Sequence, residues 1–108
     1  SFTLLGRGSQ CINTAGEKVF PEEVEEVLKT HPAIDDALVF GVADEQWGQA
    51  VTAVVEAHEP VDPDALRTHV RQHLAGYKVP KRVLIVPKVP RAPNGKADYA
   101  AAKAMAAG

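Results

Sequence analysis

The stretch PEEVEEVLKTHPAIDDALVFGV, residues 21–42, passes from a helical to an extended pattern and sets the fold class. Its first part predicts a helix, because a proline suits the first helical position and the acidic residues Glu22 and Glu23 suit the positive end of the helix dipole. Pro32 ends this helix, since proline cannot continue it. A β-rich run over 36–42 follows. One face of the helix carries the apolar spacing of a core-facing stripe, formed by Val24, Val27, Leu28 and His31.

Further elements extend this pattern on both sides. The run 50–57 follows a polar turn at 44–48, which predicts an antiparallel pair with the run 36–42. The remaining predicted elements are an N-terminal hairpin over 10–20, a helix from Asp62 to Leu74 that Gly76 ends, a strand over 82–86 and an alanine-rich helix over 98–107. We therefore predict an α+β fold, a three-stranded, mainly antiparallel sheet flanked by helices with a two-stranded N-terminal hairpin.

The composition is that of an ordinary globular domain. The chain has 108 residues, 45% hydrophobic and 24% charged, with a formal net charge of -2, so it fits one domain over 1–108 and gives no reason to expect nucleic acid as a partner. No apolar run is long enough to span a membrane, and no signal peptide is evident, so a cytoplasmic protein is the expectation. The single cysteine, Cys11, has no partner for an internal disulfide, and we interpret it as a packed strand residue. The apolar start without Met suggests a segment of a longer protein.

Two residue clusters have a functional and a structural interpretation. His69 and His73 lie four residues apart on a predicted helix, as two metal ligands can, but no third ligand has a suitable spacing. The acidic run Glu22, Glu23, Glu25 and Glu26 is better explained as the solvated face of its helix than as an acid-base cluster. We therefore predict no metal site.

Two loops combine glycine with lysine, in TAGEKV (14–19) and PNGK (93–96). Glycine lets the backbone pass close to a ligand, and lysine supplies a mobile positive charge for an anion. Asn-Gly is also a common turn, beside which a lysine is usually just exposed. Together the loops suggest a phosphate-bearing ligand.

Four segments, GRGSQCINTAGEKVFPEEVEEVL, HPAIDDALVFGVADEQWGQAVTAVV, LAGYKVPKRVLIV and VPRAPNGKADY, resemble in order and spacing the C-terminal domain of the adenylate-forming superfamily. The resemblance covers nearly the whole chain, and within the superfamily it is closest to fatty-acyl-CoA synthetases. It implies a lid that moves over a large N-terminal adenylation domain, which this chain does not contain.

The resemblance also implies a reaction. A carboxylic acid and ATP give acyl-AMP, and the thiol of coenzyme A then displaces AMP, with Mg²⁺ bound mainly with ATP by the N-terminal domain. The partners implied are that domain, ATP or acyl-AMP, coenzyme A and the acid, and the fragment alone is not expected to be catalytic. The alternatives are the lid of a carrier-protein-loading adenylation domain or acyl-AMP ligase, and a stand-alone, non-catalytic binding module.

By resemblance, Lys96 matches the family lysine that enters the site for adenylation. A cation between a carboxylate and a triphosphate would stabilise charge that develops in the transition state. The family commonly has Thr before the glycine and a basic residue after the lysine, whereas this chain has Asn94 and Asp98. Residues 90–96 also resemble sites of regulatory acetylation, which would remove the charge of Lys96.

The other family positions lie nearer the N-terminus. Arg7 matches an arginine close to the nucleotide, and Ser9 falls at the hinge position, where the family commonly has Asp or Lys. Gly16 matches the glycine beside the coenzyme A tunnel, in a loop that continues through Glu17 and Lys18. Further basic residues could face phosphates or be ordinary surface charges, namely Lys78, Lys81 and Arg82.

Overall fold

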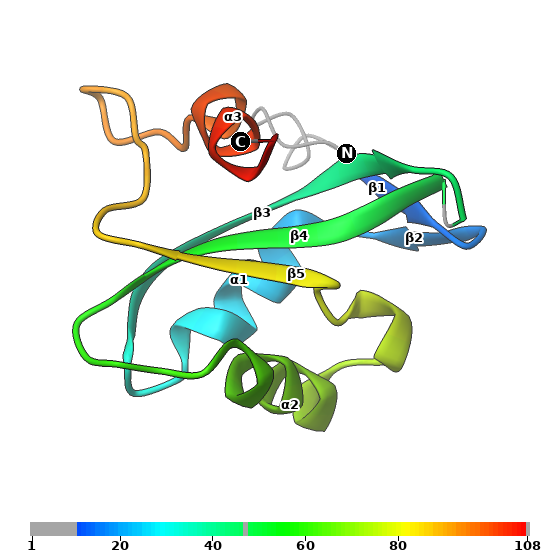
Figure 1. Cartoon of the computed structure of the whole chain (residues 1–108), viewed down its shortest axis with the longest axis horizontal. Coiled ribbons are helices and arrows are strands. Elements are labelled where there is room, and N and C mark those ends of the chain that lie inside the picture. The colour runs from blue at the N-terminus through cyan, green and yellow to red at the C-terminus, as the bar shows by residue number, and fades with distance from the viewer. Residues whose placement is uncertain (1–10, 47, 108) are drawn as a thin grey trace.

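The computed structural model describes residues 11–46 and 48–107 (Figure 1). The elements in chain order are β1 Ile12–Thr14, β2 Glu17–Val19, α1 Pro21–Lys29, β3 Ile34–Asp44, β4 Gly48–Ala57, α2 Pro63–His73, the 3₁₀ helix η2 Gly76–Lys78, β5 Arg82–Val86 and α3 Tyr99–Ala107.

The strands form one sheet around β4. β3 pairs antiparallel with β4 along its length, and β5 pairs parallel with the other edge of β4 over residues 52–56. The β1–β2 hairpin joins that same edge of β4 through the pair Thr14 and Gly48, which makes the sheet five-stranded. The predicted α+β class with a mainly antiparallel sheet is confirmed, and the hairpin is part of that sheet rather than an appendage.

Helices cover both faces of the sheet: α1 and α2 pack on one face, and α3 lies on the other (Figure 1). Alternate residues of β3 enter different cores, because successive strand side chains point to opposite faces. Val39 belongs to the core under α1 and α2, with Leu28 and Leu66, whereas Leu38 and Phe40 belong to the core under α3.

Two details differ from the sequence-based predictions. α2 begins as expected, with Asp62 Oδ1 accepting the backbone N–H of Asp64, but it ends at His73 and Gly76 starts η2. Leu74 is already extended (φ -133°, ψ 164°) and packs against the core, so the chain leaves the helix before reaching the glycine. Cys11 precedes β1 and is partly exposed rather than packed within a strand. None of the described helices is both long enough and apolar enough to cross a membrane.

Candidate functional site

The segment from Pro90 to Asp98, here called the Lys96 loop, is a tight hairpin-like loop between β5 and α3. The backbone N–H of Gly95 donates to the carbonyl of Ala92 (2.8 Å), and the N–H of Ala92 donates to the carbonyl of Lys96 (2.9 Å). Gly95 has φ +86°, a conformation that glycine adopts without strain. Proline at the second position of the turn and glycine at the end give the three-residue loop geometry expected for these residue types.

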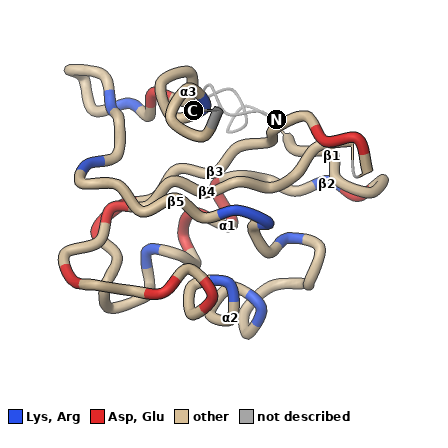
Figure 2. The backbone as a smooth tube through the Cα atoms, viewed as in Figure 1, with Lys and Arg blue, Asp and Glu red and all other residues tan. Residues whose placement is uncertain are grey.

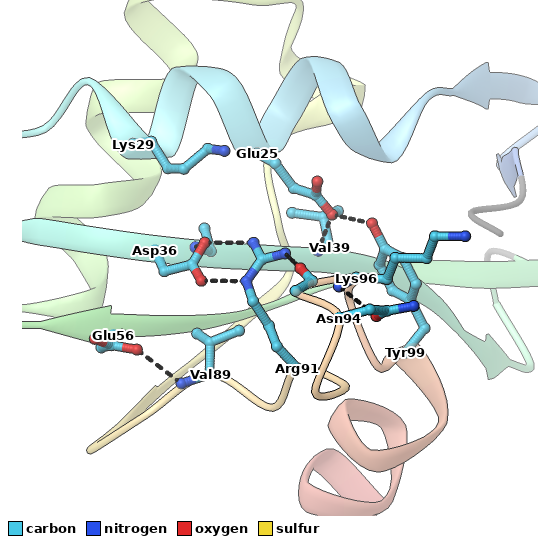
Figure 3. A network of polar contacts seen from close by, with 12 residues as sticks. Glu25, Lys29, Asp36, Val39, Glu56, Val89, Arg91, Asn94, Lys96 and Tyr99 are labelled. Carbon is cyan, nitrogen blue, oxygen red and sulfur yellow. Dashed lines mark hydrogen bonds and ion pairs between the residues drawn. The ribbon is translucent and has the colours of Figure 1, made fainter. Parts of the chain in front are cut away.

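Asn94 contributes through its side chain rather than through its backbone conformation. Its Oδ1 accepts the backbone N–H of Lys96 (3.1 Å), and its φ is not positive, so the turn needs positive φ only at Gly95. The Lys96 side chain is exposed and extends away from Arg91 (Figure 3). Within the described part of the chain, no hydrogen bond or ion pair engages its ammonium group.

Arg91 fixes the start of the loop. Its Nε donates to Asp36 Oδ2 (2.7 Å) and its Nη2 to Asp36 Oδ1 (2.8 Å), a bidentate ion pair with β3, while its Nη1 donates to the carbonyl of Gly95 (2.9 Å). These contacts are drawn in Figure 3. Hydrogen bonds from the Arg91 guanidinium hold the pKa of Asp36 below its ordinary value, so the pair is charged at neutral pH.

Tyr99 fixes the far end of the loop. Its hydroxyl donates to Glu25 Oε2 (2.6 Å), and the same oxygen accepts the backbone N–H of Val39 (2.9 Å) on β3. Burial raises the pKa of Glu25, a shift that these two hydrogen bonds oppose. Burial also raises the pKa of Tyr99, as does its bond to Glu25, so Tyr99 acts as a neutral donor.

The turn Thr14 to Glu17, here called the Gly16 turn, joins β1 to β2. Ala15 (φ 52°) and Gly16 (φ 83°) both have positive φ, which suits the right-handed twist of a two-residue hairpin. A Cβ on Gly16 would meet nothing within 4 Å, so the surface above it is open. Gln49 of β4 steadies this hairpin, because its Oε1 accepts the backbone N–H of Asn13 (2.8 Å).

The two glycine-lysine loops lie at opposite ends of the sheet (Figure 1). The hairpin that bears the Gly16 turn pairs with Gly48, whereas Arg91 binds Asp36, whose cross-strand partner is Glu56. Gly48 and Glu56 lie eight residues apart in β4, and strands rise about 3.3 Å per residue, which corresponds to about 26 Å. The structure therefore does not bring Lys96 and Gly16 together.

Three basic residues could face a phosphate according to the sequence, namely Lys78, Lys81 and Arg82, and one of them is already paired with an acidic side chain. Lys78 Nζ donates to Glu23 Oε1 (2.7 Å), and this hydrogen bond raises the pKa of Lys78. Lys81 donates its backbone N–H to Val51, and Arg82 is exposed at the start of β5. Figure 2 shows basic positions from η2 to the start of β5 and both acidic and basic positions along α1 and α2, on the same face of the sheet.

The ring of His69 contacts the rings of His31 and His73, and His69 and His73 also contact nearby oxygen atoms. His69 Nε2 lies 2.8 Å from Thr30 Oγ1 and 3.1 Å from the Val27 carbonyl, while His73 Nδ1 lies 2.9 Å from the carbonyl of His69. Residues 11–46 and 48–107 contain no group of three or more His, Cys, Asp and Glu side chains that could hold a metal ion. Arg7 and Ser9 lie outside the described residues.

The sequence pattern does not indicate the side chains that hold the Lys96 loop in place, which are Arg91, Asp36, Tyr99 and Glu25. Glu25 was assigned to a solvated acidic face, but it is 8% exposed, so that assignment is wrong for this residue. Its position directly after Val24 and three before Leu28 places it at the border of the apolar stripe, which was the available signal. Asp36 lies 55 positions from its partner Arg91, and Tyr99 lies 74 positions from its partner Glu25, so no local pattern connects either pair.

Comparisons with known proteins agree with this architecture. The family described as "AMP-binding enzyme C-terminal domain" matches residues 23–96. A 3-oxocholest-4-en-26-oate–CoA ligase of Rhodococcus rhodochrous is 55% identical over 103 residues, covering 94% of this chain and 19% of the relative. The chain thus spans about a fifth of the length of this curated relative.

Solved structures share the fold. A Mycobacterium tuberculosis fatty acyl CoA synthetase superposes with a TM-score of 0.83 at 32% identity, over 88% of this chain and 19% of that one. The amide bond synthetase McbA from Marinactinospora thermotolerans gives 0.84 at 36% identity, over 90% and 20%. By sequence match and by fold, the chain belongs to the family of AMP-binding enzyme C-terminal domains.

Proposed function

We propose that this domain is the mobile lid of an ATP-dependent, AMP-forming acid–CoA ligase and that Lys96 serves the first step. The observation that carries the proposal is the exposed ammonium group of Lys96, held on a loop that is fixed at both ends. A lysine that must enter an active site formed by another domain has to be exposed in the lid itself.

The first step joins two anions. A carboxylate oxygen attacks the α-phosphorus of ATP, a new P–O bond forms, and the bond to the departing pyrophosphate breaks. Lys96 would lie between the carboxylate and the phosphates, where a single cation offsets their repulsion and stabilises charge in the transition state. In the second step the thiol of coenzyme A attacks the acyl carbon and AMP leaves.

The Gly16 turn would serve the second step. It presents an open surface without a side chain, which suits the passage of a thin pantetheine arm. The pairing points of the two loops on β4, Gly48 and Glu56, lie about 26 Å apart, so a single orientation of the lid would not present both loops to one site. A rotation of the lid between the steps would present Lys96 first and the loop Gly16–Glu17–Lys18 second. We retain Ser9 as the hinge and Arg7 as the nucleotide-proximal residue in this proposal.

The acid is proposed from the relatives. Those at 55% and 53% identity are named as ligases of 3-oxocholest-4-en-26-oate and of medium- and long-chain fatty acids. A large apolar carboxylic acid is therefore the proposed substrate class, bound by the rest of the protein. Mg²⁺ would enter with ATP, and no step assigned to this domain depends on a metal ligand.

The test separates the two half-reactions of the full-length ligase. Lys96→Ala is expected to slow acyl-AMP formation, measured by pyrophosphate release, on the order of 10²- to 10³-fold, and to spare thioester formation from supplied acyl-AMP. Lys103→Ala, which removes an exposed lysine of α3, is the matched control and should leave both rates unchanged. Equal losses in the two half-reactions of Lys96→Ala would overturn the assignment.

A second candidate follows from the likeness to McbA, which is titled an amide bond synthetase rather than a CoA ligase. An acyl-AMP made by the parent protein could pass to an amine or to a carrier protein. Omitting coenzyme A distinguishes these cases: a CoA ligase accumulates acyl-AMP without turning over, whereas the alternatives complete the reaction with their own acceptor.

A further inference from the structure

The strongest unassigned feature of the molecule is the arginine at the start of the Lys96 loop. Arg91 makes three hydrogen bonds of 2.7 to 2.9 Å, two to the carboxylate of Asp36 on β3 and one to the carbonyl of Gly95. Gly95 directly precedes Lys96. The guanidinium therefore connects the rigid sheet to the peptide bond on which Lys96 is carried.

This contact limits how far the loop can move. The tip of the loop, residues 92–96, is held otherwise by two backbone hydrogen bonds of the turn and by the Asn94 side chain, all of which lie within the loop itself. Those bonds preserve its local shape but do not fix its orientation to the rest of the domain. The Arg91 contacts do so at the carbonyl of Gly95, because Asp36 belongs to β3 and pairs across the ladder with Glu56. On the far side of Lys96 the chain is held by Ala97, which packs against the core under α3, and by Tyr99.

The charge on Arg91 is already matched by Asp36. A guanidinium that already binds both oxygens of a carboxylate has less attraction for an additional anion, so Arg91 does not compete with Lys96 for a phosphate. Its planar fork also allows it to bind the carboxylate on one side and the carbonyl on the other, an arrangement that a lysine ammonium reproduces poorly. Arg91 is thus suited to hold the loop in place rather than to bind substrate.

We propose that Arg91 is a positioning residue for Lys96, which uses its ion pair with Asp36 and its bond to Gly95 to aim the lysine at the reacting groups. The inference rests on the proposed function of Lys96. A loop free to swing would still carry the ammonium group, but a displacement of the charge by about 1 Å can cost as much as about 10²-fold in rate.

The experiment uses the full-length ligase and follows the two half-reactions separately. Arg91→Ala and Asp36→Asn are each expected to lower kcat for acyl-AMP formation roughly 10- to 100-fold, with little change in KM for ATP, while thioester formation from supplied acyl-AMP is unchanged. The double variant should be no slower than either single one, because both changes break the same contact. Arg91→Lys should recover only a small part of the loss, since it restores charge without the fork.

Arg67→Ala is the matched control. Arg67 Nη1 lies 2.7 Å from Asp64 Oδ1 on α2, the same distance as in the Arg91 pair, and its side chain is 28% exposed against 35% for Arg91. Its loss should change neither half-reaction.

The outcomes separate this inference from the proposed function. If Lys96→Ala selectively impairs adenylation but Arg91→Ala does not, the positioning role of Arg91 is wrong while the role of Lys96 stands. Full activity of Arg91→Lys, or equal losses in both half-reactions of Arg91→Ala, likewise overturns it. If Lys96→Ala itself shows no selective loss, the proposed function fails first.

Discussion

The hydroxyl of Tyr99 lies 2.6 Å from Oε2 of Glu25 and donates a hydrogen bond to it, although the two residues are 74 positions apart in the chain. The contact connects the start of α3 to the middle of α1. Because Glu25 also accepts the backbone N–H of Val39, one carboxylate joins two helices and β3. The end of the Lys96 loop is thereby fixed to α1 and to β3.

Removing the Tyr99 hydroxyl should destabilise the domain. In Tyr99→Phe the ring still packs against the core under α3, but Glu25 loses a hydrogen-bond donor while remaining buried. We therefore expect the free energy of unfolding to fall by about 1 to 2 kcal/mol. Urea denaturation of the chain measures this. Tyr77→Phe, at an exposed tyrosine of η2, is the control and should match the parent. A Tyr99→Phe chain as stable as the parent would show that the bond contributes nothing.

The pH dependence of stability should report the burial of Glu25. Its pKa is raised above the ordinary 4.5, so the folded state holds the proton more tightly than the unfolded state. Glu25 therefore adds to the free energy of unfolding at low pH, and this contribution is lost as the pH rises from about 4.5 through the raised pKa. Glu25→Gln should lack this loss, whereas Glu26→Gln, at an exposed neighbour on α1, should retain it. Parallel stability curves for the parent and Glu25→Gln would contradict the prediction.

Substitutions of Gly16 can separate backbone strain from obstruction of the surface above it. Asn tolerates positive φ better than Ala, so Gly16→Asn should preserve the hairpin while adding a side chain to the open surface. If the proposed ligase function holds, Gly16→Asn in the full-length protein should slow thioester formation from supplied acyl-AMP and spare adenylation. A normal rate of thioester formation in a stably folded Gly16→Asn would remove Gly16 from the second step.

Loss of the Gln49 side chain should also slow thioester formation. Gln49→Ala removes the acceptor for Asn13 N–H, and among the described residues the remaining strand pairing between β1 and β4 is that of Thr14 with Gly48. We expect faster hydrogen exchange of the amides in β1 and β2 and a slower thioester step, with adenylation unchanged. Gln72→Ala, at an exposed glutamine of α2, is the control. Unchanged exchange in Gln49→Ala would show that the hairpin does not depend on this contact.

Acetylation of Lys96 should block adenylation selectively. The modification neutralises the ammonium group, and the exposed loop leaves that group accessible to a modifying enzyme. A full-length ligase carrying acetyl-lysine at position 96 should release pyrophosphate as slowly as Lys96→Ala and should recover on deacetylation. Undiminished adenylation by the fully acetylated protein would exclude this form of regulation.

The sequence by itself determined the secondary structure and the loops. Apolar spacing and terminal prolines predicted α1 and α2, alternating β-rich runs predicted β3 and β4, and Asn94-Gly95 predicted the turn beside Lys96, because each of these signals acts over a few neighbouring residues. Only the tertiary structure decided how the Lys96 loop is held. The partners of Arg91 and Tyr99 are Asp36 and Glu25, each more than 50 positions away. Such pairings arise when packing brings distant segments together, and burial then turns a glutamate that looks solvated in the sequence into an internal anchor.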